Sequence, residues 1–387
     1  MKNEHRANAA EPLVIVTSSY PAEDEAGDCA AGYFVHDFAQ ALNRRGRKVV
    51  VVTQRKREGS LSRSGFEVRA YPWSGGDRRA VELTLKRPQD IRHVWSLVTQ
   101  GVAALRRTCA EVRPRRVLCM WAVPAGLMAM RALRSNGIPY DVWCLGSDIW
   151  LYGRRPSTAW LIRRVLAGAD RLFADGYGLA SDVERVSGRN CRFLPSARVL
   201  PAETPVSPRL APGRPNLLFV GRWHPHKGVD LLPRAMRLLR EAGANAHLHI
   251  FGGGPLEDKL KAEVAGQDVA DCVTLNGYAD LRTASAYLRA CNLLIIPSRI
   301  ESIPVVFSDA VHCGIPVVGT DVGDLGALIA RYRLGAVAQP ESPESLADAM
   351  RRMLAHDRSA YRAGMRLARE VFDIEKAAQQ YLNDVAS

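Results

Sequence analysis

Two carboxylates, Glu301 and Asp309, and two cations, Arg222 and Lys227, are the side chains of this sequence whose types and spacing could do chemistry. The acids lie eight residues apart, and at ~100° per helical residue that spacing puts them roughly on neighbouring faces. Carboxylates beside an anion site would suit a phosphorylated polyol. An acid/base pair is also open on these residues alone. Two structural roles are open as well, with Asp309 as a solvated helix residue and Glu301 as a helix cap.

A βαβ unit is predicted to position the two acids. Residues 293–296 form a continuous apolar run, as expected of a strand that is buried on both faces. Pro304 suits the first turn of a helix that runs up to Gly314, which fits the C-terminal end of that helix. Residues 315–319 read as a second buried strand. Glu301 therefore falls in the loop at the carboxyl end of a strand, where open α/β sheets bind ligands, and beside a helix N-terminus that favours an anion.

The two cations lie in one of three loops that we expect to converge. Residues 221–228, 252–255 and 298–304 each follow a predicted strand of the second half, and the loops after parallel strands gather at one edge of a sheet. Arg222 and Lys227 supply the charge-assisted contacts that phosphate favours. Either cation alone could be an ordinary surface residue, but the three loops together predict a site for a phosphate-bearing ligand.

Alternating strand and helix patterns run through both halves and predict two parallel, doubly wound sheets. In the first half, Gly32 follows a long loop at the start of a helix, where a glycine lets a ligand approach the backbone closely. No G-x-G-x-x-G follows the first strand, so a nicotinamide-type fingerprint is absent. Six prolines between positions 195 and 215 indicate an interdomain linker. We predict an N-terminal domain at 1–200, a linker at 201–215, a C-terminal domain at 216–365 and a final helical segment at 366–387.

Composition limits the partners and the kind of site. The chain has 387 residues and a net charge of +13, with arginine pairs and clusters concentrated in the first half, Arg55-Lys56-Arg57 and Arg78-Arg79 among them. These suggest contact with an anionic membrane surface or a lipid acceptor, or else arginine on solvated faces. No aromatic-interleaved basic motif supports nucleic-acid binding. The eight scattered cysteines include no C-x-x-C, so we expect reduced core cysteines and no metal site.

The start of the chain and its apolar runs bear on location. Residues 1–12 are polar and charged, and no run of ~18 apolar residues occurs. We therefore expect no signal peptide and no membrane span, and a cytoplasmic protein that can lie at the inner face of the membrane.

Several motifs in this order resemble retaining GT-B glycosyltransferases of family 4. In the second half they are Gly221-Arg222 with Lys227-Gly228, the glycine loop 251–255, Glu301 with Asp309, and the strand 314–319. In the first half, residues 32–35, 41–49 and 145–148 are similar to the family as well. The resemblance covers essentially the whole chain from Leu13.

The resemblance implies a fold and a division of labour. The fold would be GT-B, with two Rossmann-like doubly wound parallel-sheet domains facing across a cleft. The N-terminal domain would bind the acceptor and the C-terminal domain the nucleotide-sugar donor. The segment 366–387 would return to the N-terminal domain. Arg222 and Lys227 would hold the donor diphosphate, Glu301 the sugar hydroxyls and Asp309 the ribose. Asp148 would be the nearest polar group to the donor sugar from the first domain. No metal or other cofactor is implied. The remaining donor-binding positions would be Gly32, Gly221, Gly252, Gly253, Ser302, Ile303, Pro304 and Val305.

Four positions depart from the family pattern. In the turn after Thr320, Asp324 stands in place of a second glycine. Asp309 is one methylene shorter than the usual second glutamate. Pro304 stands where a glycine is common and removes one backbone N–H donor. Leu145 stands where many relatives carry a histidine.

The function implied is transfer of a hexose from a nucleotide-diphosphate sugar to a carbohydrate acceptor. We expect that acceptor to be lipid-linked and destined for a polysaccharide or glycoconjugate. The alternatives are a nucleotide-sugar epimerase of the same architecture and a catalytically weak homologue that only binds the nucleotide sugar. The residues do not name the base, which can be uracil, guanine or adenine.

Overall fold

The computed structural model describes residues 12–21, 32–54, 65–76, 78, 83, 87–153 and 156–386. Cys29, the basic cluster 55–57, Arg79 and the Arg154-Arg155 pair lie outside these residues. The chain divides into two compact units. The first contains the described residues up to Pro195 together with those from Ile374 onward, and the second contains Ser196–Asp373. The division thus lies at residues 195/196 and 373/374, and residues 366–373 belong to the second unit.

The first unit is built on a seven-stranded sheet in which every described strand pair is parallel. The strand order is β3-β2-β1-β4-β5-β6-β7, so the chain reverses direction across the sheet between β1 and β4. Runs such as the four valines of β2 form strands because β-branched side chains pack well on a sheet covered on both faces. The strands are β1 (Leu13–Val16), β2 (Val49–Gln54), β3 (Glu67–Tyr71), β4 (Arg116–Met120), β5 (Tyr140–Cys144), β6 (Leu172–Ala174) and β7 (Cys191–Phe193).

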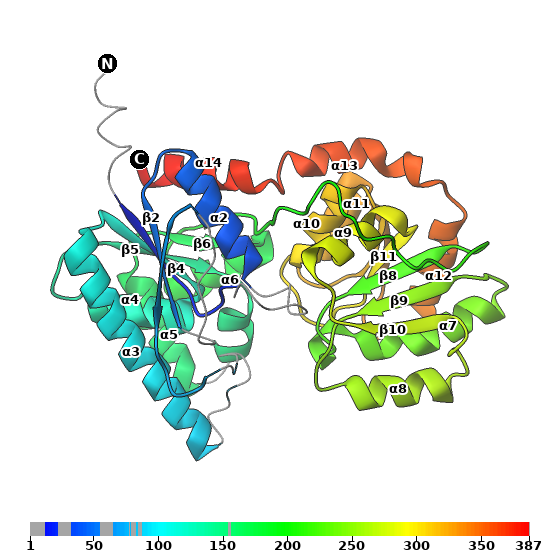
Figure 1. Cartoon of the computed structure of the whole chain (residues 1–387), viewed down its shortest axis with the longest axis horizontal. Helices are drawn as coiled ribbons and strands as arrows, with labels where there is room; N and C mark the ends of the chain where they lie inside the picture. Colours follow the sequence, from blue (N-terminus) through cyan, green and yellow to red (C-terminus); the bar gives the residue numbers. More distant parts are fainter. Residues whose placement is uncertain are drawn as a thin grey trace. The chain divides into compact units, whose positions relative to one another are not determined.

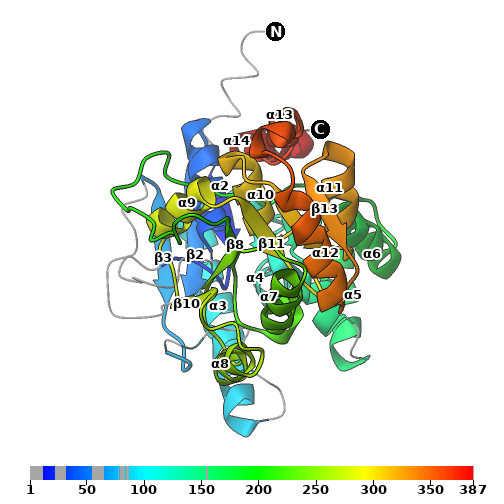
Figure 2. The same ribbon diagram turned by 90° about the vertical axis from the view of Figure 1, so that its right-hand side faces the viewer.

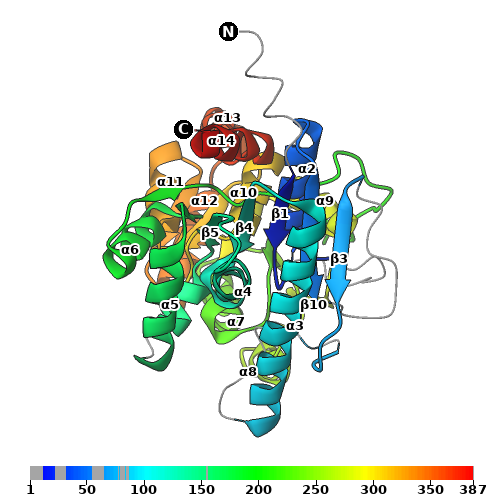
Figure 3. The same cartoon turned by 90° about the vertical axis from the view of Figure 1, so that its left-hand side faces the viewer.

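Helices cover both faces of this sheet (Figures 1 and 3). The last helix of the chain, α14 (Ile374–Ala386), packs along α2 (Tyr33–Arg44) on one face. Its Tyr381 hydroxyl donates a hydrogen bond of 2.9 Å to Asp141, and Glu375 accepts from Arg44 and Arg45. The other face carries α3 (Pro88–Val112), α4 (Leu127–Ala132), α5 (Pro156–Gly168) and α6 (Tyr177–Ser187).

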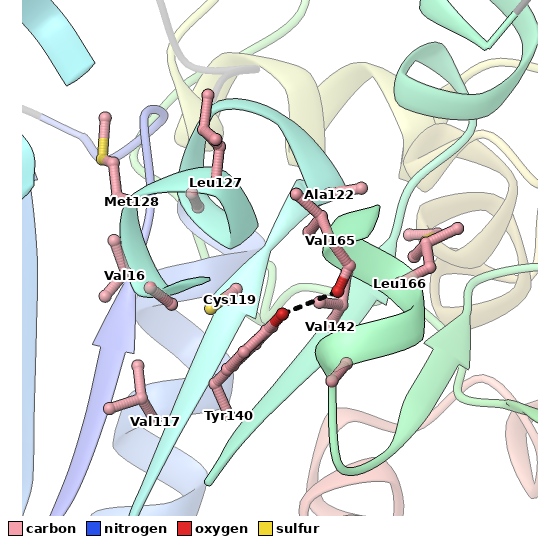
Figure 4. Packing of buried hydrophobic residues seen from close by; sticks show 14 of the residues in the cluster. Val16, Val117, Cys119, Ala122, Leu127, Met128, Tyr140, Val142, Val165 and Leu166 are labelled. Carbon is pink, nitrogen blue, oxygen red and sulfur yellow. Dashed lines mark hydrogen bonds between the residues drawn. The ribbon is translucent and has the colours of Figure 1, made fainter. Parts of the chain in front are cut away.

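The core of the first unit lies between its sheet and the helices α3 to α6. Figure 4 shows Val16, Val117 and Val142 from three strands meeting side chains of α4 and α5. The Tyr140 hydroxyl lies among these side chains and donates to the Val165 carbonyl at 2.7 Å. The buried phenol therefore keeps a hydrogen bond, as burial of a polar group requires.

The second unit repeats the plan with a six-stranded parallel sheet in the order β10-β9-β8-β11-β12-β13. The chain reverses direction across this sheet between β8 and β11, which are hydrogen-bonded neighbours. The strands are β8 (Asn216–Val220), β9 (His247–Phe251), β10 (Val273–Gly277), β11 (Leu293–Ile296), β12 (Val317–Thr320) and β13 (Gly335–Ala338). The fold is therefore two Rossmann-like parallel-sheet units, as predicted.

Two groups of helices enclose the second sheet (Figures 1 and 2). On one face α7 (Leu232–Glu241) packs between α8 (Glu257–Gly266) and α12 (Pro343–Leu354). The other face carries α9 (Leu281–Ala290), α10 (Val305–Cys313), α11 (Leu325–Tyr332) and α13 (Arg362–Arg369). Gly314 ends α10 in the left-handed conformation with φ 67°, the C-terminal stop that the sequence predicts.

Some elements differ from those expected. The segment after β4 is not helical throughout: an irregular turn at Trp121–Gly126, in which Val123 is extended, precedes α4. β7 and α11 were not predicted. β7 has three residues next to a proline-rich stretch, and the glycines before α11 obscured the apolar spacing of Leu325, Leu328 and Ile329.

Candidate functional site

The candidate site of the second unit lies where its sheet changes direction. The loops after β8 and β11, residues 221–228 and 297–304, leave neighbouring strands at the same edge. In doubly wound sheets the chain departs from such a pair toward opposite faces, which opens a crevice at the strand ends. Most of the predicted donor-binding residues lie on these two loops.

The three loops expected to converge are hydrogen-bonded to one another. The Trp223 amide donates to the Gly253 carbonyl at 2.9 Å, which joins the first loop to the second. The Arg299 amide donates to the His226 carbonyl at 2.8 Å, which joins the third loop to the first. The prediction that these loops meet is confirmed, and the backbone contacts fix their relative positions.

Two glycines make this close packing possible. A Cβ atom on Gly228 would lie 1.8 Å from the Pro297 carbonyl oxygen, and one on Gly252 would lie 1.9 Å from the Gly221 carbonyl oxygen. Their φ angles are +65° and +143°, values that side chains disfavour. Glycine is therefore required here for loop-to-loop contact within the unit.

An ion pair joins two predicted site residues across these loops. The Lys227 ammonium donates to Oε2 of Glu301, which also accepts from the Ser298 hydroxyl at 3.4 Å. The side chains are 25% and 15% exposed, so both remain within reach of a ligand. Glu301 does not cap α10, because Pro304 occupies the N-cap position without a side-chain cap bond. The helix-cap alternative for Glu301 is therefore wrong.

Arg222 is the other cation of the site. Among the described residues its guanidinium has no ion-pair partner, so it can bind an anion without breaking an existing contact. Arg222 and Lys227 concentrate positive charge at this loop. Their charges lower the pKa of His224 and of His226, although burial of the two imidazoles lowers these pKa values more. The two imidazoles stack edge to face at 4.6 Å and are neutral near pH 7.

Two buried polar atoms at the loops lack a protein partner in the described part of the chain. They are the Ser302 hydroxyl oxygen and the indole Nε1 of Trp223, whose side chains are 4% and 3% exposed. Ser302 comes shortly before α10, the first-turn amides of which have no intrahelical acceptor. Burial without a hydrogen bond is costly, and such atoms are common where a bound ligand completes the pairing. Ile303 and Pro304 are also buried, and Val305 is half-buried.

Asp309 does not reach solvent. It is 0% exposed, and both carboxylate oxygens accept hydrogen bonds from the Arg198 guanidinium. The solvated-residue alternative for Asp309 is wrong. The expected ribose contact stays a prediction, and both carboxylate oxygens already accept from Arg198 in this arrangement.

The first unit holds two further predicted residues, Gly32 and Asp148. Gly32 precedes α2 with φ +92°, and a Cβ atom there would lie 2.8 Å from the Ser19 carbonyl oxygen, so its close neighbour is the loop after β1. Asp148 is fully buried and accepts hydrogen bonds from the amides of Ala122 at 2.8 Å and Leu145 at 3.3 Å. Burial raises the pKa of its carboxyl, against the opposing effect of these bonds. Asp148 therefore ties together the loops that follow β4 and β5.

Three tryptophans of the first unit lie at or near the carboxyl ends of β4 and β5, where doubly wound sheets bind ligands. Trp143 is a core residue, since it is fully buried and its Nε1 donates to the Leu194 carbonyl. Trp150 donates to Asp182 at 2.7 Å. Trp121 differs from both, because it is half-buried and has a φ of +72° at the carboxyl end of β4. Such strain in a bulky residue is typical of functional positions.

A cavity of about 730 Å³ in the second unit lies away from the predicted residues. Four arginines line it, but Arg358 and Arg369 donate to carbonyls at the ends of α9 and α10. These contacts satisfy the last turns of the two helices and give the arginines a structural role.

The described residues contain neither a cluster of metal ligands nor a membrane-spanning helix. No group of three or more His, Cys, Asp or Glu side chains there is placed to hold a metal ion. No helix in that part is long and apolar enough to cross a bilayer.

Comparison with known proteins gives matches in both units. Residues 214–356 match the family model of glycosyl transferases group 1, and residues 30–200 match the glycosyl transferase 4-like domain. The putative teichuronic acid biosynthesis glycosyltransferase TuaC of Bacillus subtilis is 26% identical, over 88% of each chain.

Two solved structures share the fold. Sucrose-phosphate synthase from Thermosynechococcus elongatus has a TM-score of 0.80 at 20% identity, over 97% of this chain and 98% of that one. Anabaena HepE in complex with UDP-glucose has a TM-score of 0.74 at 14% identity, over 97% and 99%. From these matches and the paired parallel sheets, the chain belongs to the family 4 glycosyltransferases of the GT-B fold.

Proposed function

We propose that this glycosyltransferase moves a hexose from a nucleotide-diphosphate sugar to a carbohydrate acceptor, with retention of the anomeric configuration and without a metal. The observation that carries the proposal is the Lys227–Glu301 ion pair at the direction change of the second sheet. It lies on the same loops as Arg222, which has no ion-pair partner within the described part of the chain. It places cations for a diphosphate next to a carboxylate for sugar hydroxyls.

The proposed chemistry assigns one task to each group. Arg222, Lys227 and the first amides of α10 bind the donor diphosphate, and Glu301 accepts from hydroxyls of the hexose. The acceptor oxygen forms a bond to the anomeric carbon on the face that the diphosphate leaves. The bond from that carbon to the diphosphate breaks, and the acceptor proton ends on the departing diphosphate. The cations stabilise the charge that develops on it.

Known relatives support the substrate class. HepE was solved with UDP-glucose, and TuaC is named for the biosynthesis of teichuronic acid. By analogy we propose a nucleotide-sugar donor and an acceptor that belongs to a growing glycoconjugate.

A lipid-linked acceptor, met at the inner face of the membrane, is the finer part of the proposal. Exposed aromatic residues beside arginines support it. On α3, Trp95 is 69% exposed and lies one turn after Ile91 and Arg92. On α5, Trp160 is 61% exposed, and the Arg164 guanidinium lies over its ring. Tryptophan favours the bilayer interface, and arginine favours anionic lipid. Loss of sedimentation with anionic vesicles in a Trp95→Ala/Trp160→Ala variant would test this part.

The function itself is tested by incubating the purified chain with UDP-, GDP- and ADP-sugars, with and without a chelator. We expect one donor to stabilise the protein thermally and to be consumed, equally with chelator present. NMR of the glycoside formed should show the donor's anomeric configuration. Conversion of the donor to another nucleotide sugar without an acceptor would identify an epimerase. Binding without turnover on any acceptor would identify a silent homologue.

A further inference from the structure

The arginine-lined cavity of the second unit holds more positive charge than its surroundings neutralise. It lies where α13 packs against the carboxyl end of α10, and its volume is about 730 Å³. That volume is within the range of small-molecule sites. Its charged lining residues, among those that the structure describes, are one carboxylate, Asp357, and four arginines: Arg358, Arg362, Arg366 and Arg369.

Two of these arginines donate to backbone carbonyls and have no carboxylate partner in the described part of the chain. Arg369 donates to two carbonyls of the last turn of α10, each at 2.9 Å. Arg358 donates to five carbonyls at the ends of α9 and α10. Both residues are half-buried. Burial lowers the pKa of Arg358, and the charges of Arg289 and Arg362 lower it further, so this guanidinium lies among like charges.

The other two arginines lie on the exposed part of α13. Arg362 and Arg366 are four residues apart and Arg369 follows three residues later, so the three side chains form one row along the helix. Like charges at this spacing repel one another. Neither Arg362 nor Arg366 forms a hydrogen bond or an ion pair with the residues that the structure describes. Their guanidinium groups are therefore available to a ligand.

The negative groups around the cavity do not balance this charge. Asp357 is ionised at neutral pH, because its hydrogen bond with Ser359 and, to a smaller extent, the charge of Arg362 lower its pKa. The carboxyl ends of α9 and α10 are each equivalent to roughly half a negative charge. Four arginines thus exceed these groups by about two positive charges. A phosphate monoester near pH 7 carries about two negative charges and several acceptor oxygens.

We infer that this cavity binds an anion that carries a phosphate group, at a site separate from the donor loops. Arg362 and Arg366 make the direct contacts, since their forked guanidinium groups match phosphate geometry. Arg358 and Arg369 form the positively charged wall behind them. The donor loop precedes the first turn of α10, whereas the cavity lies at its last turn, so the two sites occupy opposite ends of one helix. The inference does not depend on the proposed donor chemistry.

The test is calorimetric titration of the intact chain with inorganic pyrophosphate. It is done on the Lys227→Ala variant, because a diphosphate can also bind at the proposed donor site. We expect a Kd of about 1 mM or tighter at 0.15 M salt. Adding Arg362→Gln/Arg366→Gln should weaken binding by about tenfold or more, since two charge-assisted contacts are lost. Both arginines are exposed and repel each other, so the melting temperature without ligand should not fall.

A charge-matched control is Arg237→Gln/Arg351→Gln in the same Lys227→Ala background. These two arginines are exposed on α7 and α12, where they pair with Glu241 and Asp348 outside the cavity. The control should bind pyrophosphate as its parent does. Equal affinities for the cavity variant and the control would show nonspecific attraction to a basic surface and would overturn the inference.

Sedimentation of the wild-type chain with phosphatidylcholine vesicles, with and without phosphatidic acid, distinguishes the sources of the phosphate. Binding of pyrophosphate without sedimentation would assign the cavity to a soluble phosphate compound. Sedimentation that requires phosphatidic acid and is lost in Arg362→Gln/Arg366→Gln would assign it to a lipid headgroup. Failure to bind either probe would overturn the inference. Binding of pyrophosphate in the cavity by a chain that binds no nucleotide sugar would overturn the proposed function alone.

Discussion

The ammonium of Lys227 is hydrogen-bonded to the carboxylate of Glu301, and the two residues come from loops that follow neighbouring parallel strands. Each therefore holds the other in place before any donor arrives, which lowers the entropic cost of ordering two long side chains on binding. Replacing the two residues should have different effects, because Lys227 is proposed to contact phosphate and Glu301 the sugar.

Replacement of Glu301 should affect the sugar and spare the nucleotide. We expect Glu301→Ala to lower kcat for transfer by about 10²-fold or more, since a positioned carboxylate orients the hexose in the transition state. Affinity for the nucleoside diphosphate, which lacks the sugar, should stay within about threefold of the wild type. Transfer assays and calorimetry measure the two effects.

A matched control is Glu241→Ala, which breaks an exposed ion pair with Arg237 at the end of α7. Its transfer rate should equal that of the wild type. Near-normal transfer by Glu301→Ala would show that Glu301 does not orient the sugar.

Replacement of Lys227 should weaken binding of the nucleoside diphosphate itself. Lys227→Ala deletes a charge-assisted phosphate contact, so affinity for the nucleoside diphosphate should fall by about 10-fold to 100-fold. Lys261→Ala is the control, because Lys261 also pairs with an acid of the second unit, Glu257, on an exposed surface. Equal nucleotide affinities for Lys227→Ala and the wild type would argue against phosphate binding by this loop.

Replacement of Asp148 should lower the free energy of unfolding. Asp148→Asn replaces one acceptor oxygen by an amide group that faces a backbone N–H of Ala122 or Leu145. We expect a loss of about 1–3 kcal/mol in the free energy of unfolding. Chemical denaturation measures it, with exposed Asp258→Asn as the control. An unchanged unfolding midpoint would mean that the two amide contacts contribute little.

Acidification should destabilise the second unit through His249. Burial, and to a smaller extent His247, lower the pKa of His249 from 6.5 to about 4, and its Nε2 lies 2.9 Å from Oδ1 of Asn216. The unfolded chain takes up a proton at this residue as the pH falls below about 6.5, while the folded chain resists until about 4. The stability that His249 contributes is thus present above pH 6.5 and lost toward pH 4.

The measurement is the unfolding free energy as a function of pH, compared between the wild type and His249→Gln. The variant should lose less stability between pH 6.5 and pH 4. His356→Gln, at an exposed position, should follow the wild type. Identical pH profiles for His249→Gln and the wild type would contradict the assignment.

The sequence predicts most of this fold because buried parallel strands leave apolar runs that need no long-range information. The strand at 293–296 and the end of α10 at Gly314 were predicted at the residues where they occur. Convergence of the site loops followed from topology, since neighbouring parallel strands end at one edge. Local patterns do not predict which loop residues then pair with each other.

Arg198 and Asp309 show where sequence reasoning ends. They are 111 positions apart, and nothing near Arg198 distinguishes it from the many other arginines of the chain. Asp148 was interpreted as a donor contact. In the structure its carboxylate accepts hydrogen bonds from backbone amides, one of which belongs to Ala122, 26 positions earlier. Trp223, whose indole nitrogen is buried and unpaired among the described residues, carried a signal that could have been used: a large aromatic residue inside a cationic loop.

The path of the chain between the units has a consequence for synthesis. Among the described residues the second unit is one continuous stretch, Ser196–Asp373, whereas the first also needs α14, with Tyr381 on Asp141 and Glu375 on Arg44. Translation therefore supplies every residue of the second unit before the last piece of the first leaves the ribosome. On the growing chain the second unit, which is proposed to bind the donor, can fold first. The first unit can complete its fold only after α14 has been synthesised.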